Sequence, residues 1–260
     1  MRTSGVSVQA YLVVDNNFLA MLTDYCCDTY RSQFPGRSLI KKTGQWISNL
    51  LNILRELTPD KRIHCTDCVA AEYKPAASHL YSVLGRNEND YRNLAADVRS
   101  CLNQSQIDSR DLSFLRELPT APRKLIGPGG VSDPDLSLVA LGLHLADQGE
   151  SVYILSNDKD LVDFSTWACK CAKAELRQRW ANPSLLQGLQ SLAYLEWVHQ
   201  SCSIATDDMW QLLKYYMREH VAREDLGKLK GEAIFQSLMD ITTSLVESAQ
   251  IKAQARITNV

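Results

Sequence analysis

The stretch VSDPDLSLVALGLHLADQGESVYILSNDKDLVDF, residues 131–164, decides the fold that we expect for this chain. Its first half has the form of a helix with clear ends. Asp133 suits the cap of a helix and Pro134 suits its first position, whereas Gly149 suits the residue at which a helix stops. We therefore predict a helix from 133 to about 147.

Two apolar runs in the chain resemble central strands of a sheet. The second half of the stretch contains SVYIL at 151–155, and AYLVV occupies 10–14 near the start of the chain. Short apolar runs rich in β-formers are typical of strands buried on both faces, as in parallel sheets. Strands that alternate with helices predict an α/β doubly wound, Rossmann-like fold, whose sites lie beyond the carboxyl ends of the strands.

The rest of the chain is predicted to be mostly helical. A short strand is expected at 63–65, followed by a helix that starts near Thr66 or Asp67 and contains Glu72. Apolar residues at helical spacing predict further helices at 18–33, 44–57, 88–103, 111–118, 160–166, 183–200, 206–223 and 228–252. Residues 167–175 are predicted to form an edge strand.

These elements predict one α/β domain with an appendage. We expect the domain at 1–175, with a helical insert around 74–130, and a helical C-terminal extension at 176–260. The length of 260 residues, with 45% hydrophobic and 22% charged residues, agrees with an ordinary globular protein. The net charge of −2 argues against a protein that coats nucleic acid by charge alone, but it does not exclude a nuclease with a carboxylate site.

The sequence predicts no secretory signal and no membrane span. The first residues lack a long apolar segment, and no run of 18 apolar residues occurs in the chain. We therefore expect a cytoplasmic protein whose eight cysteines are free thiols. A zinc site made by Cys65, Cys68, Cys169 and Cys171 is not favoured, because the two pairs are expected far apart in the sheet.

Four acidic residues occupy positions where a shared site is expected. Asp15 ends the first apolar run, Asp158 follows the second, Asp135 opens the helix between them, and Glu72 follows the short strand. Clustered carboxylates repel one another, and a divalent cation with a preference for oxygen ligands relieves that repulsion. Taken singly, however, each acid also has a structural explanation as a helix cap, a first-turn acid or a solvated side chain.

The motifs around these acids resemble those of the PIN-domain nuclease family. The resemblance covers roughly residues 8–166 and is carried by four segments: Val13-Val14-Asp15-Asn16-Asn17, Thr66 to Glu72, Asp135 to Ala140, and Ser156-Asn157-Asp158-Lys159-Asp160-Leu161. The third and fourth segments together are the most specific.

The resemblance implies a nuclease that hydrolyses phosphodiester bonds with Mg²⁺ or Mn²⁺, acting on single-stranded RNA. The four acids would be the catalytic metal ligands, and Asn17 and Ser156 would orient them or contact the substrate phosphate. Asp133 and Asp160 are additional candidate ligands.

Two other functions remain open from the sequence. The chain could be a non-catalytic PIN-like module that binds a protein partner or self-associates through residues 180–260. It could also be a DNA nuclease of the related flap type. Basic residues that could contact a nucleic-acid backbone occur in the insert and after the last expected strand: Arg86, Arg92, Arg99, Arg123, Lys124, Lys170, Lys173, Arg177 and Arg179.

Overall fold

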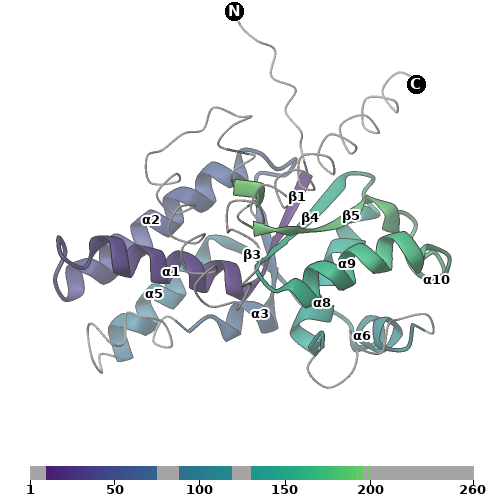
Figure 1. Ribbon diagram of the computed structural model, residues 1–260, viewed down its shortest axis with the longest axis horizontal. Coiled ribbons are helices and arrows are strands. Elements are labelled where there is room, and N and C mark those ends of the chain that lie inside the picture. Colours follow the sequence, from purple (N-terminus) through teal and green to yellow (C-terminus); the bar gives the residue numbers. More distant parts are fainter. Residues whose placement is uncertain (1–9, 75–87, 119–129, 192, 196–197, 199–260) are drawn as a thin grey trace, which may run out of the picture.

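A parallel sheet of five strands forms the centre of the protein in the computed structural model (Figure 1). The structure describes residues 10–74, 88–118, 130–191, 193–195 and 198. The strand order is β3-β2-β1-β4-β5, and every neighbouring pair is parallel. The strands are β1 (Ala10–Val14), β2 (Ile63–Thr66), β3 (Leu102–Ser105), β4 (Ser151–Ser156) and β5 (Leu186–Gln190). This arrangement confirms the predicted doubly wound α/β class.

The central strands β1 and β4 are buried along almost their whole length. Every residue of β1 is buried, and the two strands pair in register from Ala10 with Ser151 to Val14 with Leu155. The backbone N–H of Asp15 continues the pairing by donating to the carbonyl of Leu155 at 3.1 Å. The residue that follows β1 therefore lies beside the last residue of β4.

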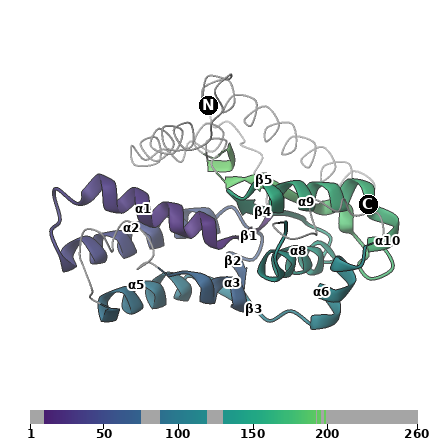
Figure 2. The same cartoon turned by 60° about the horizontal axis from the view of Figure 1, so that its bottom comes forward.

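Helices cover both faces of the sheet (Figures 1 and 2). The chain moves from β1 through β2 to β3 in one direction and then through β4 to β5 in the other, so right-handed connections place the two sets of helices on opposite faces. The helices are α1 (Asn16–Tyr30), α2 (Arg37–Arg55), α3 (Asp67–Glu72), α5 (Glu88–Ser100), α6 (Ser109–Arg116), α8 (Asp133–Ala146), α9 (Lys159–Cys171) and α10 (Lys173–Leu176).

Strand β3 corrects the prediction of a helix over 88–103. The helix α5 ends at Ser100, and the chain then forms an edge strand at 102–105, inside the segment 74–130 that was expected to be a helical insert. The sequence LNQS lacks an apolar run because only its first residue is buried. An edge strand with one partner does not require the continuous apolar pattern of a central strand.

Strand β5 corrects two further predictions. The expected edge strand at 167–175 is helical, since α9 extends to Cys171 and α10 follows it. The edge strand lies instead at 186–190, within the predicted helix 183–200 and beyond the expected domain boundary at 175. The apolar spacing there fits a helix as well as a strand. The predicted helices 206–223 and 228–252 lie outside the described residues.

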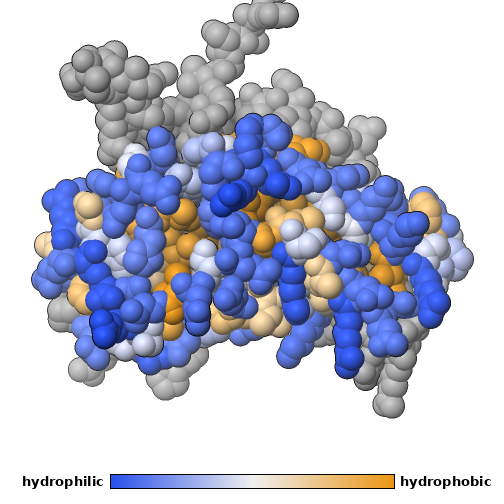
Figure 3. Space-filling view, turned by 180° about the vertical axis from the view of Figure 1, so that it is seen from behind, coloured by the Kyte–Doolittle hydropathy of each residue, from blue (hydrophilic) through white to orange (hydrophobic). Residues whose placement is uncertain are grey.

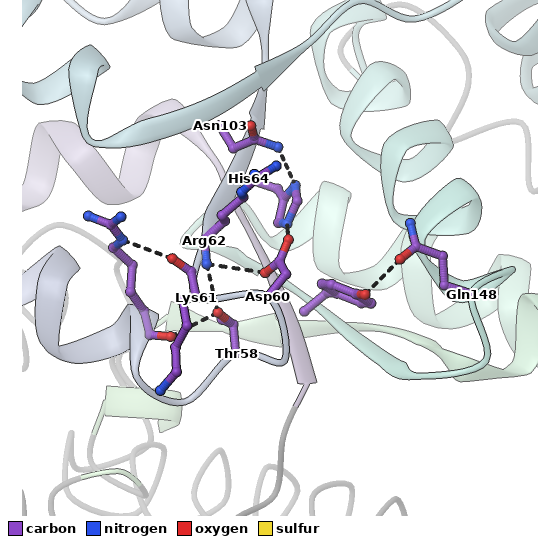
Figure 4. Close-up of polar contacts among 9 residues, drawn as sticks. Thr58, Asp60, Lys61, Arg62, His64, Asn103 and Gln148 are labelled. Carbon is purple, nitrogen blue, oxygen red and sulfur yellow. Dashed lines mark hydrogen bonds and ion pairs between the residues drawn. The ribbon is translucent and has the colours of Figure 1, made fainter.

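A set of polar contacts fixes the loop before β2 and the start of that strand (Figure 4). His64 is buried; its Nε2 lies 2.9 Å from Oδ2 of Asp60, and its Nδ1 lies 3.1 Å from the amide nitrogen of Asn103 on β3. The amide nitrogen of Asn103 can only donate, so Nδ1 of His64 accepts and the proton of the neutral imidazole is on Nε2. Burial lowers the pKa of His64 and favours this neutral form.

The surface turned away from the viewer in Figure 1 is mostly hydrophilic, with several separate apolar areas between polar side chains (Figure 3). Among the helices that the structure describes, none combines the length and apolar character needed to cross a membrane.

Gly188 provides a test of the strand assignment at 186–190. A Cβ at this position would lie 2.9 Å from the carbonyl oxygen of Val162 and 3.0 Å from Cβ of Ser165, both on α9. Because a backbone atom cannot move aside cheaply, we expect Gly188→Ala to lower the free energy of unfolding by roughly 1–3 kcal/mol. Urea unfolding of the variant measures this change.

Gly44→Ala, within α2, is the matched control, because its new Cβ would meet only the end of the Leu94 side chain, at 3.0 Å. If residues 183–200 were helical, Gly188→Ala would instead raise the stability by roughly 1 kcal/mol. A stabilised Gly188→Ala protein would therefore contradict strand β5.

Candidate active site

Asp15 is the most deeply buried of the four predicted acids, with 4% of its surface exposed. It follows β1 and occupies the N-cap position of α1, in the middle of the sheet. The pKa of Asp15 is raised from its ordinary value of 3.8 to about 6, mainly by burial and to a smaller extent by the negative charge of Asp135. The hydroxyl of Ser156 and the backbone amides of Asn16 and Asn17 act in the opposite direction.

Ser156 connects Asp15 to Asp158. Its hydroxyl donates to Oδ2 of Asp15 at 2.6 Å and accepts from the backbone N–H of Asp158 at 2.9 Å. Asp158 is the N-cap of α9, and its Oδ1 accepts from the backbone N–H of Asp160 at 2.8 Å. The structural explanation of Asp158 as a cap is thus confirmed. The cap engages one carboxylate oxygen; Oδ2 has no hydrogen bond to a described residue.

Asp135 lies in the first turn of α8 and forms a capping box with Ser132. Its Oδ2 accepts from the backbone N–H of Ser132 at 2.8 Å and from the Ser132 hydroxyl at 2.7 Å. The N-cap of this helix is therefore Ser132, which corrects the expected role of Asp133. Asp133 is exposed and forms an ion pair with Arg116 of α6.

Glu72 is the last residue of α3, and its surface is exposed. Partial burial of its carboxylate raises the pKa of Glu72, and the charge of Asp135 raises it further. Arg99 on α5 holds the backbone on both sides of Glu72, because its Nη2 donates to the carbonyls of Ala71 at 3.3 Å and Tyr73 at 3.0 Å. Arg99 is one of the basic residues that could contact a nucleic-acid backbone, and in the structure it supports the end of α3.

The structure brings the four predicted acids to one edge of the sheet through two different links. Asp15 and Asp158 are joined through Ser156, while Asp135 interacts electrostatically with both Asp15 and Glu72. The other candidates are less closely involved. Asn17 and Asp133 are exposed, and of Asp160 only the backbone N–H is engaged, with Asp158.

Two asparagines next to the acids were missed as site residues. Asn16 and Asn157 each have a buried Oδ1 with no donor among the described residues. The Nδ2 of Asn157 contacts the sulfur of Met21 at 3.3 Å. The only sequence signal for them is their position directly beside Asp15 and Asp158. Buried amide oxygens without a partner are costly, so each requires a cation or a donor from another source.

The chemistry of the available donors fits a hard divalent cation. Carboxylate and amide oxygens are the ligands that Mg²⁺ and Mn²⁺ prefer, and Mg²⁺ is often bound by one or two carboxylates with several waters. Within the described part of the chain, no three His, Cys, Asp or Glu side chains lie close enough together to hold one metal ion. The types of ligand atom therefore fit a divalent cation, and the number of protein side chains that bind it directly stays a prediction.

The cysteines do not form the zinc site considered from the sequence. Cys65 lies in β2 and Cys68 in α3, whereas Cys169 and Cys171 belong to α9, which packs on β4 and β5. The seven cysteines in the described ranges are all free thiols.

Comparison with known proteins gives no further guide. No family model matches the chain, and no curated protein or solved structure shows significant similarity to it.

The raised pKa of Asp15 predicts a pH dependence of stability in the metal-free protein. The carboxyl group of Asp15 loses its proton near pH 4 in the unfolded chain and near pH 6 in the folded chain. The folded state therefore holds the proton more tightly, and this contribution to the free energy of unfolding is complete below pH 4. It is lost as the pH rises through about 6. We expect roughly 3 kcal/mol from this group, at about 1.4 kcal/mol per pKa unit. Urea unfolding in chelator between pH 4 and 8 measures it.

Asp15→Asn is the comparison for this measurement, because the amide cannot ionise while its oxygen can still accept from Ser156. The difference between the two unfolding free energies isolates Asp15 from all other titrating groups. Parallel curves for wild type and Asp15→Asn would show that Asp15 titrates normally and is not buried as described.

Proposed function

We propose that this protein is a metal-dependent nuclease that hydrolyses phosphodiester bonds at the carboxyl edge of its sheet. The observation that carries the proposal is the buried carboxylate of Asp15, which is bonded to Ser156 and electrostatically coupled to Asp135. Burial and the neighbouring negative charge raise the free energy of the ionised carboxylate, and a bound cation lowers it again. The PIN-like motifs around the same residues give the reaction class.

Asp15, Glu72, Asp135 and Asp158 would hold Mg²⁺ or Mn²⁺ in the proposed site. When bound, the cation activates a water molecule and stabilises negative charge on the attacked phosphate. Ser156 keeps one oxygen of Asp15 occupied and so fixes the direction of the carboxylate. With a pKa of about 6, Asp15 is mostly ionised at neutral pH and is then available as a ligand.

The proposed substrate is single-stranded RNA, and the proposed location is the cytoplasm. Both follow from the family resemblance and from the free thiols rather than from the geometry of the site. A panel of single-stranded RNA, single-stranded DNA and branched DNA separates the ribonuclease from a flap-type DNA nuclease. Preferential cleavage of branched DNA would replace the proposed substrate while leaving the proposed reaction intact.

A second function is supported by the capping interactions of two of the acids. Asp135 and Asp158 each have a structural role at a helix start, so their presence does not require catalysis. A non-catalytic module would use residues 180–260 to bind a protein or a second copy of the chain. Calorimetry with Mn²⁺ and light scattering distinguish the two: no metal binding, together with a stable dimer, favours the module.

The nuclease proposal predicts that two substitutions abolish the activity. We expect Asp15→Asn combined with Asp158→Asn to reduce cleavage of labelled single-stranded RNA in Mn²⁺ by more than about 100-fold. Loss of a contact that only supports a metal ligand lowers activity by about 10–100-fold, and loss of the ligands themselves is expected to have a larger effect. The substitutions retain the size of the side chains and the oxygens that accept from Ser156 and cap α9.

The matched control is Asp97→Asn combined with Glu117→Gln, which removes the same two charges from exposed positions. Any electrostatic effect on RNA binding at long range is shared by both double variants. Equal cleavage by the site variant and the wild type would contradict the site.

A further inference from the structure

A small network of hydroxyl and thiol groups connects the start of α8 to the end of β2. Oγ1 of Thr66 and Oγ of Ser137 are 2.7 Å apart, although 71 positions separate them in the sequence. Sγ of Cys68 lies 3.2 Å from Ser137 Oγ and 3.3 Å from Thr66 Oγ1. Both hydroxyl residues are buried, with 1% of their surface exposed.

The direction of the hydrogen bond between Thr66 and Ser137 follows from a second contact that Ser137 makes. Ser137 Oγ donates to the carbonyl of Pro134 at 2.6 Å, within the first turn of α8. A serine hydroxyl has one proton, so Thr66 must be the donor in the contact between the two hydroxyls. The chain of bonds therefore runs from Thr66 at the end of β2, through Ser137, to the backbone of α8.

The Thr66 side chain does not make the hydrogen bond that is usual for a threonine at the start of a helix. Thr66 occupies the N-cap position of α3, where threonine side chains ordinarily accept from a backbone N–H of the helix. Its side chain makes no such cap bond here. The hydroxyl is directed to a different helix, so the contact between Thr66 and Ser137 specifies how α8 sits against β2 and α3.

The network lies among the proposed site residues. Ser137 is two positions after Asp135 on α8, and Thr66 precedes α3, which ends at Glu72. The register of Val13 with His64 places Thr66, two residues further along β2, beside Asp15 at the end of β1. Any shift of α8 relative to β2 therefore changes the separation of Asp135 from both Asp15 and Glu72.

We propose that Thr66 and Ser137 are positioning residues that set Asp135 of α8 against Glu72 and Asp15. The consequence for metal binding and catalysis rests on the proposed function, whereas the placement of α8 does not. Outer contacts that orient metal ligands commonly change metal affinity or activity by 10–100-fold.

Two substitutions remove the network in the full chain. Ser137→Ala deletes the central acceptor, and Thr66→Val deletes the donor while keeping the branched shape of the side chain. We expect each to weaken Mn²⁺ binding, measured by electron paramagnetic resonance, by about 10-fold, and to lower kcat for RNA by a similar factor. KM for RNA is expected to change less than twofold, since the side chains of both residues are buried.

Thr66→Ser and Ser165→Ala are the controls. Thr66→Ser keeps the donor and is expected to retain Mn²⁺ affinity within about threefold of wild type. Ser165 is a buried serine of α9 whose hydroxyl donates to the carbonyl of Leu161 at 2.7 Å, so Ser165→Ala removes a comparable helix contact away from Thr66 and Asp135. Its Tm is expected to fall with no change in Mn²⁺ affinity.

Hydrogen exchange provides a readout that is independent of metal and activity. We expect faster exchange at residues 135–138 in Ser137→Ala and Thr66→Val, well below the Tm of each variant, and unchanged exchange there in Ser165→Ala. Wild-type protein that neither binds Mn²⁺ nor cleaves RNA would overturn the proposed function, and exchange alone would then decide the placement of α8.

Two results would overturn the positioning role itself. One is unchanged exchange at 135–138 in both network variants. The other is an active wild type whose Mn²⁺ affinity and kcat persist in both variants while only the Tm falls, as in Ser165→Ala.

Discussion

The carboxylate of Asp15 lies at the centre of the sheet and is almost completely shielded from water. The residues around it therefore have to accommodate a buried negative charge. Asp15 follows β1, and the parallel pairing of β1 with β4 places Ser156 directly beside it. An isolated buried carboxylate is costly unless hydrogen bonds or opposite charge compensate for the lost hydration. The hydrogen bonds from Ser156 and from the backbone amides of Asn16 and Asn17 compensate only in part, because the pKa of Asp15 stays raised. The neighbouring charge of Asp135 increases the cost, and the proposed cation would offset it.

The capping roles of Asp135 and Asp158 are compatible with this explanation. A cap engages one carboxylate oxygen and thereby fixes the direction of the other, as it does for Asp158 at the start of α9. Asp135 likewise accepts both Ser132 hydrogen bonds on a single oxygen, Oδ2. A carboxylate that is oriented before a ligand arrives loses less entropy on binding than a freely rotating one. The same hydrogen bonds would also exist in a protein without activity, which is why the two proposed functions share one fold.

The fold class and the central strands were predictable because their signals are local. The apolar runs of β1 and β4 and the helix α8 (Asp133–Ala146) carry their boundaries in the sequence, and each boundary is within a residue or two of the prediction. The edge strands β3 and β5 were mispredicted because they have one partner and no continuous apolar run. The leucines at 185, just before β5, and at 186 and 189 within it have a spacing that suits a helix equally well, so only the pairing of β5 with β4 decides between helix and strand.

The candidate site was predictable in its location but not in its internal geometry. Acids after parallel strands converge on one edge whatever their exact placement, so the motifs around Asp15 and Asp158 were sufficient to predict that the two acids lie on the same edge. The separation of Asp135 from Glu72 depends instead on how α8 packs against α3, which is set by contacts between distant residues. The hydroxyls of Thr66 and Ser137 and the guanidinium of Arg99 make such contacts, and none of them belongs to a local motif. The fold therefore brings the acids to one edge of the sheet, while the distances between them are proposed to depend on buried polar contacts such as that of Thr66 with Ser137.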